Sequence, residues 1–405
     1  MVTVQLLTKF NYLYNYKMLA LKDFLYEHCE EPLVVALRAK DPLAMGSHFW
    51  RVGHSSKPET GSIRSRGFGF ITYDYKNEIE DLTSRNNEKI KFPALCFFSP
   101  ESKKIIAESG FRDVPDSNLK RDPDIRLNAR VPKSTYIEQV KKLKSKILSG
   151  EIYEVNYCME FYAEDVQLDP VAVFISLLGN SDAPFSCFFK YRDSYLLGAS
   201  PECFLKKQGN RLISRPIKGT ARRGESTHED NKIIEDLRND KKERSENIMI
   251  TDLVRNDLSK VAKTGSVKVE ELCGVYSFRQ VHQMISTISC ELRDSVTFED
   301  IIRATFPMGS MTGAPKIRAM ELIDQHESSR RELYSGCVGY IEENGDFEFS
   351  VVIRSICYNA TEKYMSFLVG SAITAASEPE KEYEECLLKA KAMMEVIGVD
   401  FRKFA

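Results

Sequence analysis

The chain has 405 residues, and its 57 Lys and Arg against 59 Asp and Glu leave a formal net charge of −2. With 42% hydrophobic and 10% aromatic residues it cannot be a disordered or collagen-like chain, and its length suits one large domain or two to three smaller ones. The near-neutral charge offers no long-range attraction for nucleic acid or an anionic membrane, so an anionic ligand would need a few placed cationic groups.

Several classes of protein are excluded by simple patterns. No stretch reaches the roughly 18 apolar residues that a membrane helix needs, and the first 17 residues do not resemble a signal peptide, so we expect a cytoplasmic protein. The ten cysteines form no CxxC pair, which indicates buried reduced thiols rather than disulfides or a zinc site. The six histidines show no metal-ligand spacing such as HExxH.

The first predicted elements are short and separated by polar turns: a helix over 20–30 and β-rich segments at 32–37, 68–75 and 92–98. A polar stretch with three prolines, 113–133, is the best candidate for a linker or subdomain boundary. We therefore divide the chain into an N-terminal part, 1–130, and a catalytic part, 131–405, which together form one compact globule.

The rest of the chain alternates runs of strands with a few long helices. Apolar spacing predicts a helix over 134–149 with Ser134 as its N-cap, and the string at 377–380 predicts a capping box before the last helix. The other predicted helices are 229–262, 297–304, 314–326 and 378–396. The predicted strands are 152–162, 185–190, 194–198, 202–207, 211–217, 266–271, 281–292, 336–342, 347–357 and 364–369. Hairpin-like runs of strands favour an α+β fold with large antiparallel sheets.

Two of the predicted helices each carry a pair of carboxylates three positions apart. Glu243 and Glu246 form one pair and Glu382 and Glu385 the other, so the members of each pair face the same way. Two such faces can hold a hard cation such as Mg²⁺, which prefers oxygen ligands. On spacing alone, solvated surface charge is the better interpretation, with Glu385 pairing to Lys389.

Three further segments are weak signals on their own. Residues 309–320 combine small residues with a proline at a helix start, which suits either an anionic group or an ordinary turn. Gly370 follows a predicted strand and can bring a backbone N–H against a carboxylate. Lys218 stands directly before Gly219 at a strand end, and it is either a surface lysine or, if its pKa is lowered, a nucleophile.

Taken together, seven motifs in order resemble the chorismate-utilising enzymes, a family that includes anthranilate, aminodeoxychorismate, isochorismate and salicylate synthases. The resemblance covers about residues 134–396 and implies one α+β unit with two antiparallel sheets packed face to face and helices outside. The motifs are SPE (200–202), RPIKGT (215–220), DLVRNDL (252–258), GSMTGAPKIRAM (309–320), YSGCVGY (334–340), VVIRS (351–355) and EPEKEYEE (378–385).

The resemblance also implies roles for individual residues. Glu246 and Glu385 match the positions of the Mg²⁺ ligands, with Glu243 and Glu382 as close supports. Glu202 matches the general acid that protonates the departing C4 hydroxyl of chorismate. Positions that match contacts to the substrate are Thr220, Gln283, Ser310, Tyr334, Arg354, Gly370 and Lys389.

Lys218 decides the subgroup that the resemblance implies. Anthranilate synthases carry PIAGT, with alanine at this position, whereas PIKGT is typical of aminodeoxychorismate synthases. There the lysine attacks C2 of chorismate as the C4 hydroxyl leaves, and ammonia then adds at C4 and expels the lysine. We therefore expect 4-amino-4-deoxychorismate to be made for p-aminobenzoate and folate synthesis, with ammonia from a separate glutamine amidotransferase subunit. We also expect burial or a nearby cation, such as Mg²⁺ or Arg354, to lower the pKa of Lys218.

Departures from the family pattern keep alternatives open. Gln283 stands where the family has histidine, and His282 is a poor substitute because neighbouring strand residues face opposite ways. Glu154 stands where many members have glutamine. Isochorismate and salicylate synthases place a general-base lysine in the strand near 151–160, where this chain has Glu154 and no lysine, so those activities are disfavoured. Anthranilate synthase component I is the main alternative, and a catalytically silent chorismate-binding subunit is the remote one. Because no LLES-type segment is present, we expect no inhibition by tryptophan.

Overall fold

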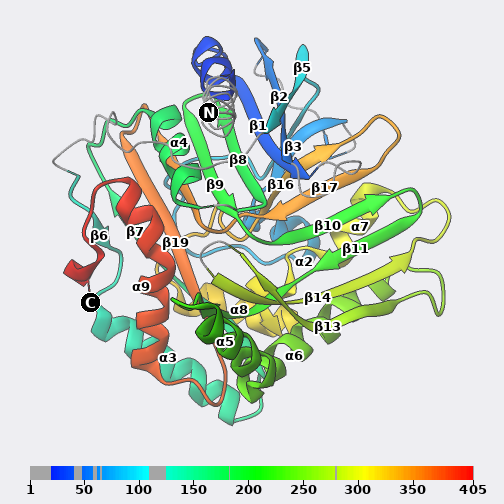
Figure 1. Cartoon of the computed structure of the whole chain (residues 1–405), viewed down its shortest axis with the longest axis vertical. Helices are drawn as coiled ribbons and strands as arrows, with labels where there is room; N and C mark the ends of the chain where they lie inside the picture. The colour runs from blue at the N-terminus through cyan, green and yellow to red at the C-terminus, as the bar shows by residue number, and fades with distance from the viewer. Residues whose placement is uncertain are drawn as a thin grey trace, which may run out of the picture.

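The computed structural model describes residues 20–40, 48–57, 62–63, 66–108, 125–181, 183–278 and 281–404. These residues form two large antiparallel sheets with helices outside them (Figure 1), which confirms the predicted α+β fold. Most of the predicted linker at 113–133 lies outside the described residues. Among the helices described, none is long and apolar enough to cross a membrane.

The first sheet has the strand order β15-β7-β19-β18-β9-β8-β1-β2-β5, and β6 pairs with β7. It joins strands from both ends of the chain, because β1 pairs with β8 and β19 pairs with β7. Its strands are β1 (Leu33–Lys40), β2 (His48–Ser55), β5 (Ser102–Glu108), β6 (Asn128–Ala129), β7 (Glu154–Ala163), β8 (Phe185–Tyr191), β9 (Ser194–Ser200), β15 (Gly313–Ala314), β18 (Ser355–Asn359) and β19 (Tyr364–Ile373).

The second sheet has the order β12-β14-β11-β10-β17-β16-β3-β4, and β13 pairs with β14. Here too an early strand, β3, pairs with a late one, β16. The division of the chain near residue 130 stays a prediction. The strands are β3 (Gly67–Ile71), β4 (Leu95–Phe98), β10 (Cys203–Gln208), β11 (Arg211–Arg215), β12 (Ile217–Arg222), β13 (Lys268–Ser277), β14 (Val281–Glu291), β16 (Cys337–Ile341) and β17 (Phe347–Val351).

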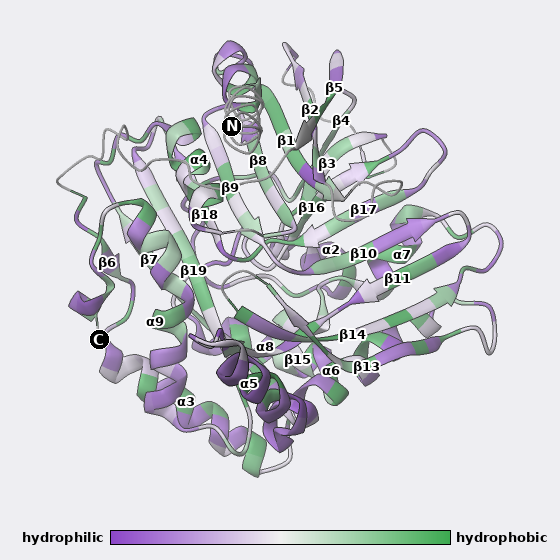
Figure 2. Ribbon diagram, in the orientation of Figure 1, coloured by the Kyte–Doolittle hydropathy of each residue, from purple (hydrophilic) through white to green (hydrophobic). Residues whose placement is uncertain are grey.

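The helices lie on the outer faces of the sheets. Figure 2 shows hydrophilic residues over α5, whereas β1 and β8 are largely hydrophobic, as expected for a surface helix and for buried strands. A helical segment covers 20–27. The named helices are η1 (Tyr73–Lys76), α2 (Asn77–Glu80), α3 (Lys133–Leu148), α4 (Pro170–Asn180), α5 (Thr227–Asn239), α6 (Lys241–Ser259), α7 (Phe298–Thr305), η3 (Gly309–Met311), α8 (Lys316–His326), α9 (Pro379–Val396) and η4 (Phe401–Phe404).

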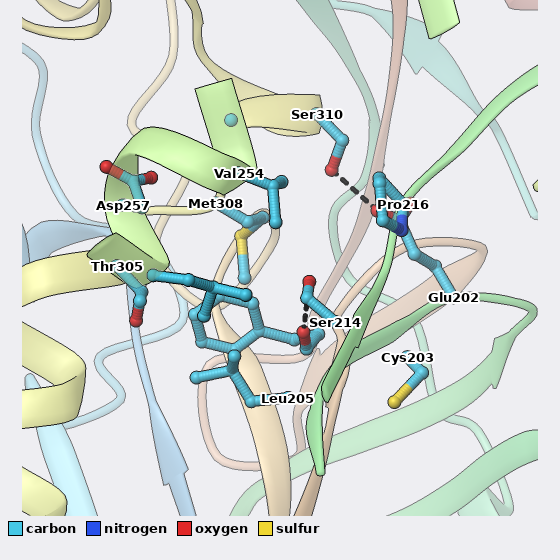
Figure 3. Close-up of a pocket in the computed structure, with 13 residues that line it drawn as sticks. Glu202, Cys203, Leu205, Ser214, Pro216, Val254, Asp257, Thr305, Met308 and Ser310 are labelled. Carbon is cyan, nitrogen blue, oxygen red and sulfur yellow. Dashed lines mark hydrogen bonds between the residues drawn. The ribbon is translucent and has the colours of Figure 1, made fainter. Parts of the chain in front are cut away.

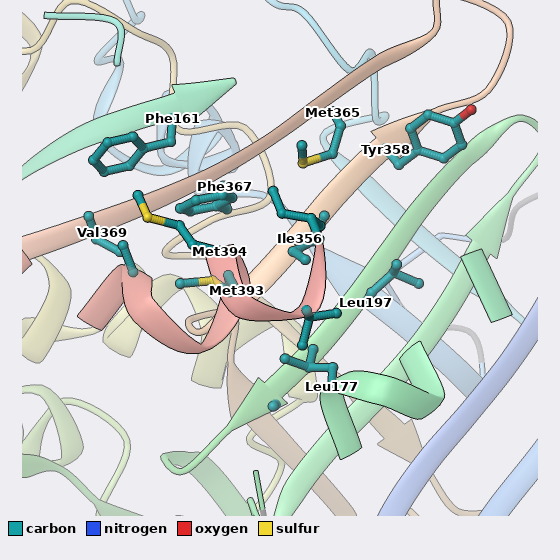
Figure 4. Close-up of a cluster of buried hydrophobic side chains, with 14 of the residues drawn as sticks. Phe161, Leu177, Leu197, Ile356, Tyr358, Met365, Phe367, Val369, Met393 and Met394 are labelled. Carbon is teal, nitrogen blue, oxygen red and sulfur yellow. The ribbon is translucent and has the colours of Figure 1, made fainter. Parts of the chain in front are cut away.

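The core lies between the sheets and beneath the helices. One buried cluster includes residues of β1 and β3, so the two sheets share an apolar interface. A second cluster lies under α9, where Met393 and Met394 pack near Phe367 and Val369 of β19 (Figure 4). This packing fixes α9 against the first sheet, and α9 carries one of the two predicted carboxylate pairs at its N-terminal end.

Three predicted helix boundaries are wrong. The single helix expected over 229–262 is two helices, because Asp240 is extended (φ −64°, ψ 119°) and its carboxylate caps α6 at the backbone N–H of Glu243. Helix α3 begins one residue earlier than expected, with Pro132 rather than Ser134 at the N-cap. The predicted capping box before α9 does not form, because the Ser377 hydroxyl instead accepts a hydrogen bond from the Thr374 N–H.

The predicted strand 347–357 is divided between the sheets. Strand β17 belongs to the second sheet and β18 to the first, and Arg354 lies in the short link with a φ of 51°. The sequence prediction also missed β2, β5 and α4. The helix α4 is apolar on nearly every side, so it lacks the amphipathic period that reveals surface helices.

Candidate active site

The predicted site residues gather where the end of the second sheet approaches the first. Strand β12 supplies Lys218, and α6 packs across β12 and β14. From the first sheet come the start of β7 and the end of β19, which α9 covers. The site is therefore assembled from elements that are distant in sequence.

Lys218 is held in a buried ion pair. Its side chain is 11% exposed, and its Nζ lies 2.7 Å from Oε1 of Glu154, which begins β7 and is 1% exposed. Burial by itself lowers the pKa of Lys218, but the attraction of Glu154 and Glu246 outweighs it and raises the pKa above its ordinary value. The expected lowering of this pKa is thus wrong as far as the protein's own groups decide it, because carboxylates rather than cations surround the amine.

Gly219 allows β12 to approach α6 closely. Its φ is +99°, and a β-carbon there would lie 3.0 Å from Cβ of Met284 and 3.2 Å from Oε2 of Glu243. This approach lets the Asn247 side chain donate a hydrogen bond of 3.1 Å to the Lys218 carbonyl oxygen. The backbone of the candidate nucleophile is thereby fixed from α6.

One carboxylate pair lies on α6 and the other on α9, and the two pairs face each other. Lys242 joins them, since its Nζ lies 3.5 Å from Oε1 of Glu382 and 3.9 Å from Oε1 of Glu246. Glu246 is 7% exposed, and its Oε1 has no hydrogen-bond partner within the part of the chain that the structure describes. Burial raises the pKa of Glu246 to about 7 and also raises the pKa of Glu243.

The second helix holds its carboxylates more firmly. Lys389 lies 2.6 Å from Oε1 of Glu385 and donates a 2.8 Å hydrogen bond to the carbonyl oxygen of Gly370. Burial alone would raise the pKa of Glu385, but the Lys389 ammonium brings the pKa below its usual range. Glu382 accepts a hydrogen bond from the Ser371 hydroxyl on β19.

The residues of this cluster fit a hard divalent cation. All the donors are carboxylate oxygens, which Mg²⁺ prefers, and the buried Oε1 of Glu246 lacks a partner that a cation would supply. The position of Lys242 shows that positive charge is accommodated between the two helices. Glu246 and Glu385 would hold the ion, with Glu243 and Glu382 beside them.

Glu202 and Ser310 form a separate acid-bearing pair. The Ser310 hydroxyl, on η3, donates a 2.6 Å hydrogen bond to Oε1 of Glu202, which follows β9 (Figure 3). Burial raises the pKa of Glu202 to about 7, although the hydrogen bond from Ser310 opposes the shift. A cavity of about 20 Å³, enough for one water molecule, borders the pair on the side of Ser214 and Val254.

Three further predicted substrate contacts, Arg354, Tyr334 and Gly370, have these surroundings. Burial lowers the pKa of Arg354, although the electrostatic influence of Tyr334 and Glu385 opposes the shift. The hydroxyl of Tyr334 accepts a weak hydrogen bond from the Cys158 thiol at 3.9 Å. The Cys158 sulfur packs directly against Gly370, since a β-carbon added at Gly370 would lie 2.5 Å from it. This face of Gly370 is therefore closed.

Gln283 and His282 face opposite sides of β14. His282 is fully buried and lies 2.8 Å from both Asp230 of α5 and Ser277 of β13, so it secures the helix rather than the site. Gln283 is 3% exposed, pairs across the ladder with the exposed Thr220, and its Oε1 has no partner among the described residues.

Sequence reasoning missed three contributors. Lys242 links the carboxylate pairs, and its position four residues before Glu246 was the available signal. Asn247 anchors the backbone at Lys218. Glu154 was noted only as a departure from the family pattern, and nothing in the sequence could show that β7 brings it against Lys218.

Comparisons with known proteins agree with this geometry. A family model described as chorismate binding enzyme matches residues 38–395. Anthranilate synthase component I from Streptococcus pneumoniae superposes with a TM-score of 0.72 at 24% identity, covering 89% of this chain and 92% of that one. This likeness concerns the fold.

Three curated relatives carry two different names. Anthranilate synthase component 1 of Aquifex aeolicus is 35% identical over 69% of this chain, which spans only 56% of that relative's length. Aminodeoxychorismate synthase component 1 of Escherichia coli is 38% identical over 80% of this chain and 68% of that relative's length. The protein of that name from Bacillus subtilis is 29% identical over 88% of this chain and 82% of its own.

Proposed function

The chain belongs to the chorismate binding enzyme family, and we propose that it converts chorismate and ammonia to 4-amino-4-deoxychorismate, the reaction expected of an aminodeoxychorismate synthase component I. One observation carries this proposal. Lys218, at the lysine position of PIKGT, places its amine 2.7 Å from the carboxylate of Glu154 and close to the carboxylate pairs. A fixed, buried amine is the group that this subgroup's covalent mechanism requires.

Glu154 is the proposed proton acceptor for Lys218. Because the pKa of Lys218 is raised, the amine is an ammonium at neutral pH and must lose a proton before it can attack. Glu154 Oε1 is already in contact, and its buried Oε2 has no hydrogen-bond partner among the described residues. This carboxylate lies in the strand near 151–160, where isochorismate and salicylate synthases are expected to carry a general-base lysine.

The proposed reaction has two balanced steps. In the first, the Lys218 nitrogen bonds to C2 of chorismate, the ring double bonds shift, and the bond from C4 to its hydroxyl breaks. Protonated Glu202 gives its proton to the departing hydroxyl, which leaves as water; with its pKa near 7, a substantial share of Glu202 carries that proton at neutral pH. In the second step ammonia bonds to C4, the bond from C2 to Lys218 breaks, and a proton returns from the new amine to the lysine.

The charge of the site explains why a cation is proposed. Chorismate is a dianion, whereas Glu154, Glu246 and Glu385 lie close to the amine that must reach it. Bound Mg²⁺ would supply the positive charge that draws a substrate carboxylate to these residues. Arg354 and Lys389 would hold the carboxylates from the other side, so substrate binding should weaken sharply in excess chelator.

The ammonia source and the setting are parts of the same proposal. We propose that a separate glutamine amidotransferase subunit delivers ammonia, as the designation component 1 of the relatives suggests, and that the enzyme works in the cytoplasm.

A product assay tests the proposed function. The purified chain is supplied with chorismate, Mg²⁺ and ammonium, and the products are separated by chromatography. We expect the 4-amino non-aromatic compound, and we expect the Lys218→Ala variant to lose its formation. Glu154→Gln keeps the size of the side chain but removes the proposed proton acceptor, so it should slow formation of the 4-amino compound across the whole pH range. Formation of the 4-amino compound by Lys218→Ala at the wild-type rate would refute covalent catalysis.

Two other outcomes would identify the alternatives. Release of the 2-amino aromatic compound would assign the chain to the anthranilate synthases. Chorismate binding without turnover would favour a silent subunit, an alternative that rests on Gln283 at the family's histidine position.

A further inference from the structure

A second group of potential metal ligands lies at the edge of the first sheet, on elements that take no part in the carboxylate site. His28 follows the helical segment 20–27, Glu31 lies in the turn before β1, and His54 lies near the end of β2. Backbone hydrogen bonds hold the three positions: His28 N–H donates to Phe24, Glu31 N–H donates to the carbonyl oxygen of His28, and the His54 carbonyl accepts from Glu101.

The three side chains converge. One ligand atom from each of His28, Glu31 and His54 lies within 4.8 Å of the other two. Nδ1 of His54 is 4.0 Å from Oε1 of Glu31, which is too long for a hydrogen bond. The imidazole rings of His28 and His54 stack with their centroids 3.8 Å apart and their planes at 15°.

One buried nitrogen of this cluster has no hydrogen-bond partner among the described residues. Nδ1 of His54 is buried, yet no group in the described part of the chain forms a hydrogen bond with it. The side chains are otherwise accessible enough for an ion to enter, at 15% exposed for each histidine and 30% for Glu31. Buried polar atoms in proteins are nearly always satisfied, so this nitrogen calls for a partner.

The local charge suits a cation. Two stacked imidazoles repel each other when both are protonated, and burial together with His54 lowers the pKa of His28, so the neutral, ligating form is favoured. Glu27 near His28 and Glu101 near His54 add negative charge, whereas Lys104 opposes it.

We propose that His28, Glu31 and His54 bind a single divalent transition-metal ion of the zinc class. Two imidazole nitrogens and one carboxylate oxygen form a donor set that Zn²⁺ accepts with a fourth position left to water, whereas Mg²⁺ favours oxygen alone. The ion would join a helix end, a turn and a strand. It would therefore fasten residues 20–31 to the sheet, and it would do so independently of chorismate turnover.

Metal titration of the full chain tests this site. The protein is freed of metal with chelator, transferred to a buffer with excess Mg²⁺ to fill the carboxylate cluster, and titrated with Zn²⁺ in a calorimeter. We expect one equivalent to bind, with proton release that grows as the pH falls toward 6.5. His28→Gln and His54→Gln should each weaken binding by about 100-fold or more, since loss of a direct ligand exceeds the 10–100-fold typical of an outer partner.

Matched variants and a second readout keep the test decisive. His228→Gln changes an exposed histidine on α5 and should bind Zn²⁺ normally, whereas Glu31→Gln, at the most exposed ligand, should weaken it without disturbing the fold. Zn²⁺ should raise the unfolding temperature of the wild type and of His228→Gln but not of His28→Gln or His54→Gln.

Two results would overturn the proposal. One is the absence of saturable Zn²⁺ binding; the other is one-equivalent binding that persists in His28→Gln and His54→Gln but disappears in Glu246→Gln, which would place the ion in the carboxylate cluster. Neither result bears on the amination of chorismate, which is assayed separately.

Discussion

Two buried ionic clusters lie near each other in this molecule, and they differ in whether their hydrogen bonds are complete. In the first, all five N–H groups of Arg331 are used: they donate to both oxygens of Glu327, to the backbone carbonyls of Met311 and Asn156, and to the Ser335 hydroxyl. In the second, around Lys218, buried oxygens of Glu154, Glu246 and Gln283 have no partner among the described residues.

This difference separates a structural cluster from a binding cluster. A buried charge is tolerated when partners replace the water it has lost, and the Arg331 cluster meets that condition within the protein. The Lys218 cluster does not, which is the condition expected of a site that a bound substrate or cation completes. Arg331 should therefore be needed for folding, and the unsatisfied carboxylates should be needed for activity.

The largest effect is expected at Glu202, the proposed general acid. Glu202→Gln keeps the shape of the side chain but removes the acidic proton that the departing hydroxyl would receive, so kcat should fall by about 10²–10⁴-fold. The free energy of unfolding should stay the same or rise, because a buried acid that ionises near pH 7 has been made neutral. Steady-state kinetics and urea denaturation measure the two quantities. Glu348→Gln, outside the site, is the control for kcat.

At Arg331 the pattern should reverse. Arg331→Met leaves Glu327 as an unpaired buried charge and should cost about 3–5 kcal/mol of unfolding free energy. Arg255→Met breaks an exposed pair with Asp252 on α6 and should cost about 1 kcal/mol or less. If both variants unfolded at the same urea concentration, completeness of the hydrogen bonds would not distinguish the Arg331 cluster.

The third test concerns the cation. Glu246→Gln should raise the Mg²⁺ concentration needed for half-maximal activity by about 100-fold. Without metal, burial favours the protonated form of Glu246, whose pKa rises from 4.5 to about 7. The metal-free wild type should therefore lose stability as the pH rises from about 4.5 through 7, and the variant should lose less. A metal-free variant less stable than the wild type at pH 7 would contradict this assignment.

The smallest predicted effect is a displacement of the pH profile. The Ser310 hydroxyl stabilises the ionised form of Glu202, so Ser310→Ala should raise the pKa of Glu202 from about 7 by about one unit. The general acid then keeps its proton to higher pH, and the alkaline decline of kcat should move upward by the same amount. An unchanged profile would mean that Ser310 does not tune the acid.

Much of the fold could be predicted because its strands and helices have ordinary periodicity. The α+β class, most strands and the helices α3, α7, α8 and α9 follow from the apolar pattern. The division of 229–262 and the missed helix α4 depended on a single capping aspartate and on burial on every side, which pattern reasoning detects poorly.

The candidate site was likewise predicted only in part. Family motifs placed Glu202, Glu246, Glu385 and Lys218 in one region, and the structure brings them together. The protonation of Lys218 was predicted in the wrong direction, because its main partner, Glu154, is 64 positions away in the chain. Likewise His28 and His54 show no metal-ligand spacing in the sequence. Pairing of β1 with β2 places His54 opposite Val34, and the turn that carries His28 lies against it.

The short link that carries Arg354 has a consequence for how ligand binding and folding are connected. The chain leaves one sheet at Val351 and enters the other at Ser355, so Arg354 belongs to the seam between them. Bound chorismate would bridge that seam if one carboxylate bound Arg354 while the ring contacted Lys218 on the second sheet and Lys389 over the first. Chorismate should then protect both sheets from unfolding together, and amide exchange should slow on either side of it rather than in one half of the molecule.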